Sequence, residues 1–270
     1  MPKLILNVKM LIIVTVLLLT AEYCGAQRSD STWHHKKCAV VLTYDDAIPQ
    51  QLDNALPILD SLQLKATFYL TAVEVKDRMD DWKKLAAKGH ELGNHTLFHP
   101  CIGGKGREWV MPDYDMNNYT VQRMIDEIKM TNIFLEALDG KKKRTFAFTC
   151  GDMKVNDTSF IDLLKNDFVA ARAVRREMHT ISQIDLYNAD CYSVHGETAA
   201  QMEQRVKAAM DTHSLLIMLF HGVGGGHALN VSLNEHNDFL HFLKQNEKDI
   251  WIAPMIEVAE YISAFQGQKK

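Results

Sequence analysis

The sequence predicts an α/β fold in which a parallel sheet is covered by helices. Short apolar runs, typical of strands buried on both faces, alternate along the chain with stretches of helical apolar spacing. This alternation favours a parallel sheet with right-handed crossovers. In addition, the residues able to do chemistry follow directly after apolar runs, and the carboxyl ends of strands are where α/β barrels carry their active sites.

The individual elements follow from local patterns. Apolar or Thr-Phe-Tyr-rich runs predict strands at 38–43, 66–70, 145–149, 168–171, 215–220 and 250–253. Apolar residues three and four apart predict helices at 50–62, 80–88, 121–138, 158–166, 201–213, 235–245 and 255–265. Pro57 is expected to shape the first helix, and Gly89 to end the second, because glycine readily adopts the left-handed conformation after a helix.

The composition is that of an ordinary globular protein. The chain has 270 residues, of which 47% are hydrophobic and 24% charged, enough for one sizeable core. A formal net charge of −4 gives no support for a nucleic acid or an anionic membrane surface as partner. The basic run at 141–144 is short and lies between a predicted helix and a predicted strand, so we interpret it as a solvated turn.

The first residues have the features of a targeting segment, predicted at 1–26. Lys3 and Lys9 precede the apolar run 10–19, which is too short for a membrane span. Small residues suit cleavage before Gln27; lipoprotein processing at Cys24 is the alternative. The expected mature protein is exported, periplasmic or secreted, with no stable membrane span. It consists of an unstructured lead-in, 27–37, and one domain, 38–265.

Two short stretches predict a metal centre. Asp45 and Asp46 follow the first predicted strand, and His95 and His99 lie four residues apart in a polar loop. One carboxylate and two neutral imidazoles suit zinc or a similar divalent ion. The second carboxylate is then available to accept a proton from an activated water. His221, after the apolar run 215–220, is placed to act as a general acid.

These stretches resemble the polysaccharide deacetylase family, also called carbohydrate esterase family 4 or the NodB-homology domain. Residues 43–47 (TYDDA) resemble its first motif, T-F-D-D-G, and residues 95–100 (HTLFHP) are similar to its second, H-[ST]-x-x-H-P. Residues 219–221 (LFH) resemble its last motif, L-x-H. The resemblance extends from about Cys38 to Ile262. It implies a distorted, incomplete (β/α) barrel.

The resemblance also implies a role for each matching residue. Asp45 corresponds to the catalytic base and His221 to the catalytic acid, while Leu219 would line the pocket for the acetyl methyl group. The implied metal ligands are Asp46, His95 and His99.

Two family motifs are poorly kept in this chain. The third, R-x-P-x-G, appears as residues 146–151 (FAFTCG), which keep the glycine but lack the arginine that orients the catalytic aspartate. Arg172 or Arg175 is a candidate replacement. The fourth motif is not clear, and Asp185 or Asp190 is a candidate partner for His221.

The expected activity is metal-dependent removal of acetyl groups from an acetylated oligo- or polysaccharide. The backbone N–H of Cys150 is expected to help stabilise the oxyanion, and Trp109 either stacks on a sugar ring or packs onto the domain. Three alternatives stay open: an acetylxylan-type esterase, a catalytically degenerate glycan-binding protein, and an iron oxygenase with two histidines and one carboxylate.

The cysteines leave the redox chemistry open. Cys24 would be lost with the targeting segment. The other four allow two disulfides, in three connectivities, or four buried thiols; they are Cys38, Cys101, Cys150 and Cys191. Cys101 and Cys150 are not expected to ligate the metal, because the oxygen and nitrogen ligand set is already complete.

Overall fold

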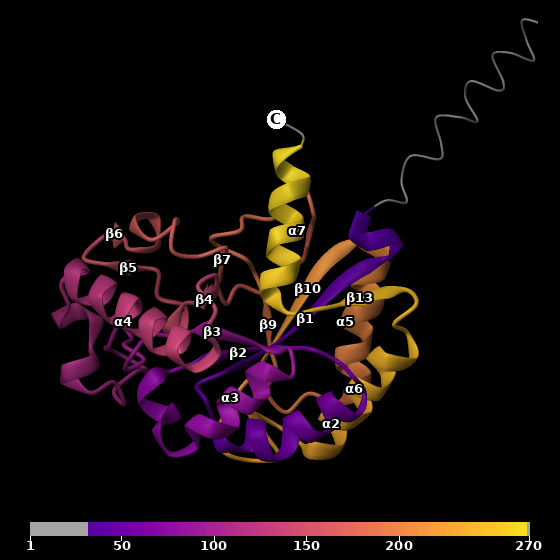
Figure 1. Cartoon of the computed structure of the whole chain (residues 1–270), viewed down its shortest axis with the longest axis horizontal. Helices are drawn as coiled ribbons and strands as arrows, with labels where there is room; N and C mark the ends of the chain where they lie inside the picture. Colours follow the sequence, from indigo (N-terminus) through magenta and orange to yellow (C-terminus); the bar gives the residue numbers. More distant parts are fainter. Residues whose placement is uncertain (1–31, 269–270) are drawn as a thin grey trace, which may run out of the picture.

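The computed structural model describes residues 32–268 (Figure 1). The predicted targeting segment, with Cys24, and the first part of the lead-in lie outside the described residues. The rest of the lead-in is structured, contrary to expectation, because Trp33 is completely buried against Trp251 and Tyr261. Within the described range, no helix combines the length and apolar character that a bilayer crossing requires.

A nine-stranded sheet forms the centre of the molecule and curls into an incomplete barrel, as predicted. Its order is β7-β4-β3-β2-β1-β10-β8, with β13 paired to β1 and β9 to β10. All pairs are parallel except β10 with β8. The strands are β1 (Cys38–Asp45), β2 (Thr67–Leu70), β3 (Glu91–Asn94), β4 (Thr145–Ala147), β7 (Ala170–Arg172), β8 (His179–Thr180), β9 (Tyr192–Ser193), β10 (Ser214–Phe220) and β13 (Ile250–Ile252).

Helices cover both faces of this sheet, which explains why its central strands read as continuous apolar runs. In β1, Val40 and Leu42 pack with α2, α3, α5 and α6, whereas Ala39 and Val41 face the core beneath α7, drawn in yellow in Figure 1. The helices are α2 (Leu56–Ser61), α3 (Met79–Ala87), α4 (Val121–Asp139), α5 (Ala199–Thr212), α6 (Leu233–Gln245) and α7 (Met255–Gly267).

Local backbone signals account for most element ends. Pro57 occupies the first turn of α2, after a π-helical turn at Gln51–Ala55. Gly89 follows the end of α3 at φ 92°, as predicted. Of the helix predicted at 158–166, only a 3-10 turn at Ile161–Leu163 is present. The first residues of that range belong to a small hairpin of β5 (Lys154–Val155) and β6 (Thr158–Ser159), because Asn156 and Asp157 both adopt positive φ and reverse the chain there.

Buried Glu91 ties three strands and a helix together. Its carboxylate accepts hydrogen bonds from the hydroxyls of Thr67 (2.8 Å) and Thr145 (2.6 Å), and from the backbone N–H groups of Thr145 (3.0 Å) and Ile256 (2.9 Å). These partners lie on β2, β4 and the first turn of α7. Burial raises the pKa of this carboxyl group, although the four hydrogen bonds oppose that rise.

We expect Glu91→Leu to destabilise the fold by about 3 kcal/mol, because it leaves several buried donors without an acceptor. Chemical denaturation monitored by circular dichroism measures this loss. The matched control is Glu260→Gln, since Glu260 is exposed and forms a surface ion pair with Lys143 that contributes little. Equal stability of Glu91→Leu and the wild type would contradict the structural role of Glu91.

The register of the sheet brings the ends of three strands to one place. Asp45 is the partner of Tyr69 on β2, Leu70 pairs with Asn94 on β3, and Tyr44 pairs with Phe220 on β10. The residues that follow β1, β3 and β10 therefore emerge side by side at the carboxyl edge of the sheet. These residues include Asp46, His95 and His221.

Candidate metal centre

The turn after β1 brings two adjacent carboxylates to the same cavity. Asp46 and Ala47 adopt positive φ values of 78° and 58°, so the chain turns sharply at the strand end. In a regular strand, Asp45 and Asp46 would point to opposite faces. With this turn, both side chains line the cavity at the carboxyl edge of the sheet.

Three side chains converge as a ligand set. Nε2 of His95 lies 3.4 Å from Oδ1 of Asp46, and Nε2 of His99 lies 3.3 Å from the same oxygen. Ligand atoms about 2.0–2.1 Å from a tetrahedral zinc ion are about 3.3 Å apart, so this spacing suits such an ion. Oδ1 of Asp46 is also buried without a hydrogen-bond partner among the described residues. The donor set and its unpaired oxygen therefore fit a divalent metal.

Outer contacts orient the two imidazoles differently. Nδ1 of His95 donates a hydrogen bond to the carbonyl oxygen of Ala147 (2.8 Å), which directs Nε2 toward Asp46. His99 is held through its backbone, whose N–H donates to the hydroxyl of Thr96 (2.9 Å), and its Nδ1 faces Sγ of Cys101 at 3.6 Å. Both imidazoles thus present Nε2 to the same point.

The charges of the cluster follow from burial and from the neighbouring groups. Burial lowers the pKa of His99 to about 4, and the charge of His95 contributes to this shift, so His99 is a neutral imidazole near pH 7. Burial acts to lower the pKa of His95, but Asp45 and Asp46 outweigh it and raise that pKa. Burial likewise opposes ionisation of Asp46, yet its histidine neighbours hold its pKa well below the ordinary value.

Asp45 is paired with a buried arginine from a neighbouring strand. Nη2 of Arg172, at the end of β7, donates to Oδ2 of Asp45, and both side chains are almost inaccessible to solvent. The guanidinium group also contacts the carbonyl oxygen of Ala173 (3.2 Å) and Sγ of Cys191 (3.6 Å). Of the two candidate arginines, Arg172 therefore contacts Asp45, whereas Arg175 lies at Asp190.

His221 enters the cavity from the end of β10 without the expected carboxylate partner. Its Nε2 lies 3.9 Å from Oδ2 of Asp46, and its ring stacks on His227 with 4.8 Å between centroids. Its buried Nδ1 has no hydrogen-bond partner within residues 32–268. Burial lowers the pKa of His221.

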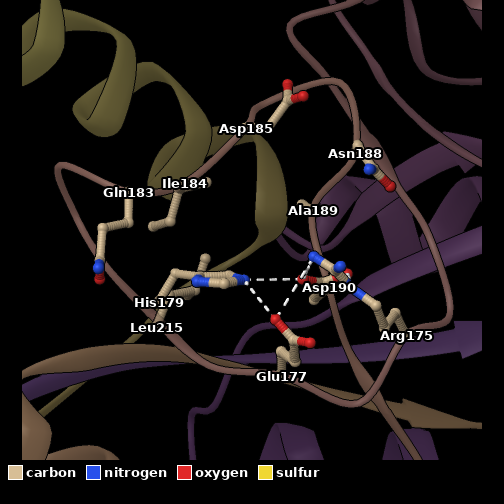
Figure 2. Close-up of a pocket in the computed structure, with 10 residues that line it drawn as sticks. All are labelled: Arg175, Glu177, His179, Gln183, Ile184, Asp185, Asn188, Ala189, Asp190 and Leu215. Atoms are coloured by element: carbon tan, nitrogen blue, oxygen red, sulfur yellow. Dashed lines mark hydrogen bonds and ion pairs between the residues drawn. The ribbon is translucent and has the colours of Figure 1, made fainter.

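The proposed pairing of His221 with Asp185 or Asp190 is wrong. Asp190 instead binds Arg175 (2.9 Å) and His179 (2.8 Å) in a separate pocket, as Figure 2 shows. Asp185 accepts a hydrogen bond from the backbone of Tyr187 (2.9 Å). Glu177 joins His179 and Asp190, and these three side chains are close enough to share an ion. Arg175 already supplies the positive charge at this pocket, which makes it an ion-pair network.

The predicted substrate-contacting residues surround the same cavity, which has a volume of about 310 Å³. Leu219, Cys150 and Trp109 line it together with the five residues discussed above. Trp109 is 61% exposed and is therefore available to a ligand. A second cavity of about 490 Å³ shares Asp46, His99, Trp109 and His227 with the first, so a cleft continues across the centre.

A sequence model of the family described as polysaccharide deacetylase matches residues 33–167, half of the chain. The chain belongs to the polysaccharide deacetylase family. The likeness covers the turn of Asp46 and the loop of His95 and His99, and the solved structures below share the curled sheet.

Curated relatives of this deacetylase-family chain match it over shorter stretches. It is 31% identical over 136 residues to the uncharacterized protein YlxY of Bacillus subtilis, covering 50% of this chain and 36% of that protein. It is 36% identical over 70 residues to a chitooligosaccharide deacetylase of Sinorhizobium fredii, 26% of this chain and 33% of that one. A peptidoglycan-N-acetylmuramic acid deacetylase of Bacillus subtilis is 27% identical over 101 residues, 37% and 38% of the two chains. The matched part is about a third of each relative.

Two solved structures show the same fold. A putative polysaccharide deacetylase from Mycobacterium smegmatis superposes with a TM-score of 0.62 at 14% identity, over 86% of this chain and 92% of that one. A pseudoenzyme of carbohydrate esterase family 4 from Bacillus anthracis superposes with a TM-score of 0.53 at 19% identity, over 83% and 66%. These likenesses support the incomplete barrel that the sequence predicts, and at such identities they concern the fold alone.

The four cysteines within the described residues of this family member form one disulfide and two free thiols. This differs from the two expected arrangements, two disulfides or four thiols. Cys101 and Cys150 are joined, and Cys38 and Cys191 are free and buried. The disulfide connects the loop that carries His99 with the loop that lines the cavity after β4. Sγ of Cys191 donates to the carbonyl oxygen of Ala173 (3.1 Å) and packs beside Arg172.

His227 is a titratable cavity residue that the sequence analysis does not single out. It follows the glycine-rich stretch Gly222–Gly226, whose composition is typical of a flexible loop, either a lid over the site or an ordinary connection. The structure instead ties this loop down through β11 (Gly222–Val223) and β12 (Asn230–Val231). Nδ1 of His227 accepts a hydrogen bond from the backbone of Leu229 (3.0 Å), which fixes the ring against His221. Only the pairing of β11 with β12 reveals this arrangement.

Proposed function

We propose that this protein is a metal-dependent hydrolase that removes acetyl groups from an acetylated glycan. The observation that carries the proposal is the convergence of Asp46, His95 and His99 on one point. Asp45 and His221 border the same cavity, as a base and an acid for hydrolysis would. The family membership of the chain supports the same reaction class.

Asp46, His95 and His99 would hold a divalent ion, for which zinc is the best candidate by ligand type. Such an ion, when bound, polarises the acetyl carbonyl and lowers the pKa of a coordinated water. An iron oxygenase would in addition need iron and an oxidisable co-substrate. Hydrolysis needs neither of them, so we do not favour the oxygenase alternative.

The protein residues would then manage the protons. Asp45 would accept the proton of the attacking water at Oδ1, because Oδ2 is engaged by Arg172 and Oδ1 is buried without a partner among the described residues. His221 would act in its imidazolium form, in which Nε2 donates a proton to the departing amine nitrogen or sugar oxygen and the ring becomes neutral. The products are acetate and the deacetylated sugar.

The remaining lining residues would position the acetylated sugar. Leu219 would contact the acetyl methyl group, and the backbone N–H of Cys150 would donate to the developing oxyanion. Trp109 would stack on a sugar ring. The cleft continues past the reacting position, which suits an oligomeric or polymeric glycan better than a single sugar.

An N-acetylated amino sugar is the substrate class we favour. Two relatives are described as a chitooligosaccharide deacetylase and a peptidoglycan-N-acetylmuramic acid deacetylase, and the second description names an N-acetylated sugar. The apolar N-terminal run at 10–19 supports export to a compartment where such glycans occur. An ester-cleaving enzyme on acetylated xylan is the alternative within the same chemistry.

Acetate release tests the proposal. Purified protein is incubated with N-acetylglucosamine oligomers, peptidoglycan and acetylated xylan, with and without a chelator. We expect release from the N-acetylated glycans, loss of release on chelation, and recovery when zinc is added back. Release that persists after complete removal of metal would contradict the metal centre. Metal-loaded protein without turnover on any of the substrates would favour the degenerate glycan-binding alternative.

A further inference from the structure

The Cys101–Cys150 disulfide lies directly against a proposed metal ligand. Cys101 is buried two residues after His99, and Cys150 lines the catalytic cavity from the neighbouring loop. His99 therefore has different atoms at its two ring nitrogens. Its Nε2 lies 3.3 Å from Oδ1 of Asp46, whereas its Nδ1 lies 3.6 Å from Sγ of Cys101.

The second nitrogen of His99 lies beside sulfur, unlike the corresponding nitrogen of His95. Nδ1 of His95 donates to the carbonyl oxygen of Ala147 at 2.8 Å. For Nδ1 of His99, the neighbour is a disulfide sulfur, which is at most a weak acceptor. Reduction of the disulfide would place a thiol sulfur, which can bind a metal ion as a thiolate, beside this nitrogen.

The spacing of these atoms suits a second metal site. A histidine nitrogen and a cysteine sulfur bound to one tetrahedral zinc ion are about 3.5 Å apart, close to the 3.6 Å found here. One ligand atom each from His99, Cys101 and Cys150 lies within 4.8 Å of the others. While the sulfurs are joined they are poor ligands, but two thiolates and an imidazole are a favoured set for zinc.

Other contacts would keep the two loops together after the disulfide is broken. The hydroxyl of Thr149 donates to the carbonyl oxygen of Pro100. Arg107 donates to the carbonyl oxygen of Cys150 (3.1 Å) and to the carboxylate of Asp152, which also accepts from the backbone of Ile102 (2.8 Å). Because of these bonds, the two thiols would remain near each other and near His99.

We propose that reduction of the Cys101–Cys150 disulfide creates a second site for a zinc-class ion, formed by the two cysteine sulfurs and Nδ1 of His99. A dithiol reductant supplies the two electrons and is itself oxidised to a disulfide, while the protein disulfide becomes two thiols. Each sulfur that binds the ion releases its proton to solvent. A water molecule can fill the fourth position of the ion.

The neutral imidazole of His99 cannot bind a metal ion in the catalytic centre and another in the thiolate site at the same time. A neutral imidazole has one nitrogen with a free lone pair and one that carries a proton. In the reduced protein Nδ1 would bind the ion, and the proton on Nε2 would face the carboxylate of Asp46. The new site would thus compete with the catalytic centre for His99. This competition rests on the proposed function; the thiolate site itself does not.

Cobalt(II) absorption tests the thiolate site. Metal-free protein is titrated with cobalt(II) under anaerobic conditions, once oxidised and once after reduction with a phosphine that is then removed. We expect an intense near-ultraviolet band from sulfur-to-cobalt charge transfer in the reduced protein alone, and its loss on reoxidation after the cobalt is removed. Cys150→Ser is expected to lack the band, and Cys38→Ser, which removes a buried thiol elsewhere, is expected to keep it.

Reduced wild-type protein without the band would overturn the proposal, and so would a band that persists in Cys150→Ser. The reversal on reoxidation needs no variant, so a folding defect in Cys150→Ser does not decide the outcome. The weaker visible bands of cobalt with oxygen and nitrogen ligands report separately on the catalytic centre in the oxidised protein. Failure of that centre and failure of the thiolate site are therefore distinguishable.

Discussion

Replacing Asp45 with asparagine is expected to lower kcat for acetyl hydrolysis by about 10²–10⁴-fold while metal remains bound. The amide keeps the size of the side chain but cannot accept the proton of the attacking water. Asp45 is not part of the converging set of Asp46, His95 and His99, so its loss leaves the metal ligands in place. His95→Ala, in contrast, is expected to lose both the metal and the activity.

Metal content by elemental analysis and acetate release, measured on the same preparations, separate these two effects. The matched control is Asp190→Asn, because Asp190 is also a buried aspartate paired with an arginine, Arg175, yet it lies in the separate pocket of Figure 2. We expect this control to retain kcat. If Asp45→Asn hydrolysed acetyl groups at the wild-type rate, another group would have to be the base.

The placement of the five central residues could be predicted because each depends on a short stretch of sequence. Asp45 ends one apolar strand and Asp46 follows it, while His221 directly follows another. In a parallel sheet such ends meet at one edge whatever the exact register. His95 and His99 follow β3, which is paired with β2 in the same sheet. Local sequence and the topology of the sheet are therefore sufficient to assemble this part of the site.

The features that sequence missed depend on contacts between distant segments. Asp190 was a reasonable partner for His221 by its position in the chain, but Arg175 and His179 lie closer and take up its carboxylate. The choice of Cys101 with Cys150 among the possible pairings depends on how two loops approach each other. No local pattern contains that information.

Arg172 shows how the register decides between candidates. Gly151 keeps the glycine of the third family motif, which places Ala147 at the position where that motif has arginine. In the sheet, Ala147 on β4 is the direct partner of Arg172 on β7. The guanidinium group is thus supplied from the adjacent strand at the same level. Sequence alone left Arg172 and Arg175 equivalent because the register was unknown.

We expect Arg172→Ala to lower kcat by roughly 10–100-fold, in the range found when an outer support of an active-site group is removed. The variant leaves the buried Asp45 carboxylate without its ion-pair partner, and breaking a buried pair in this way costs about 3–5 kcal/mol of stability. Acetate release and chemical denaturation measure the two losses. Arg175→Ala, which removes an exposed guanidinium group from the other pocket, is the control and should retain kcat.

A variant with the arginine on β4, where the family motif has it, distinguishes positioning of the Asp45 carboxylate from a general effect on stability. Because Ala147 and Arg172 are register partners, the double variant Ala147→Arg/Arg172→Ala presents a guanidinium group from β4 toward the same carboxylate, into the volume that Arg172 vacates. We expect it to recover much of the kcat that Arg172→Ala loses. Arg172→Lys keeps the charge but not the forked geometry and should recover less. If Arg172→Ala kept the wild-type kcat, Asp45 would need no arginine for catalysis. The position of the guanidinium group, on β4 or on β7, would then not affect the reaction.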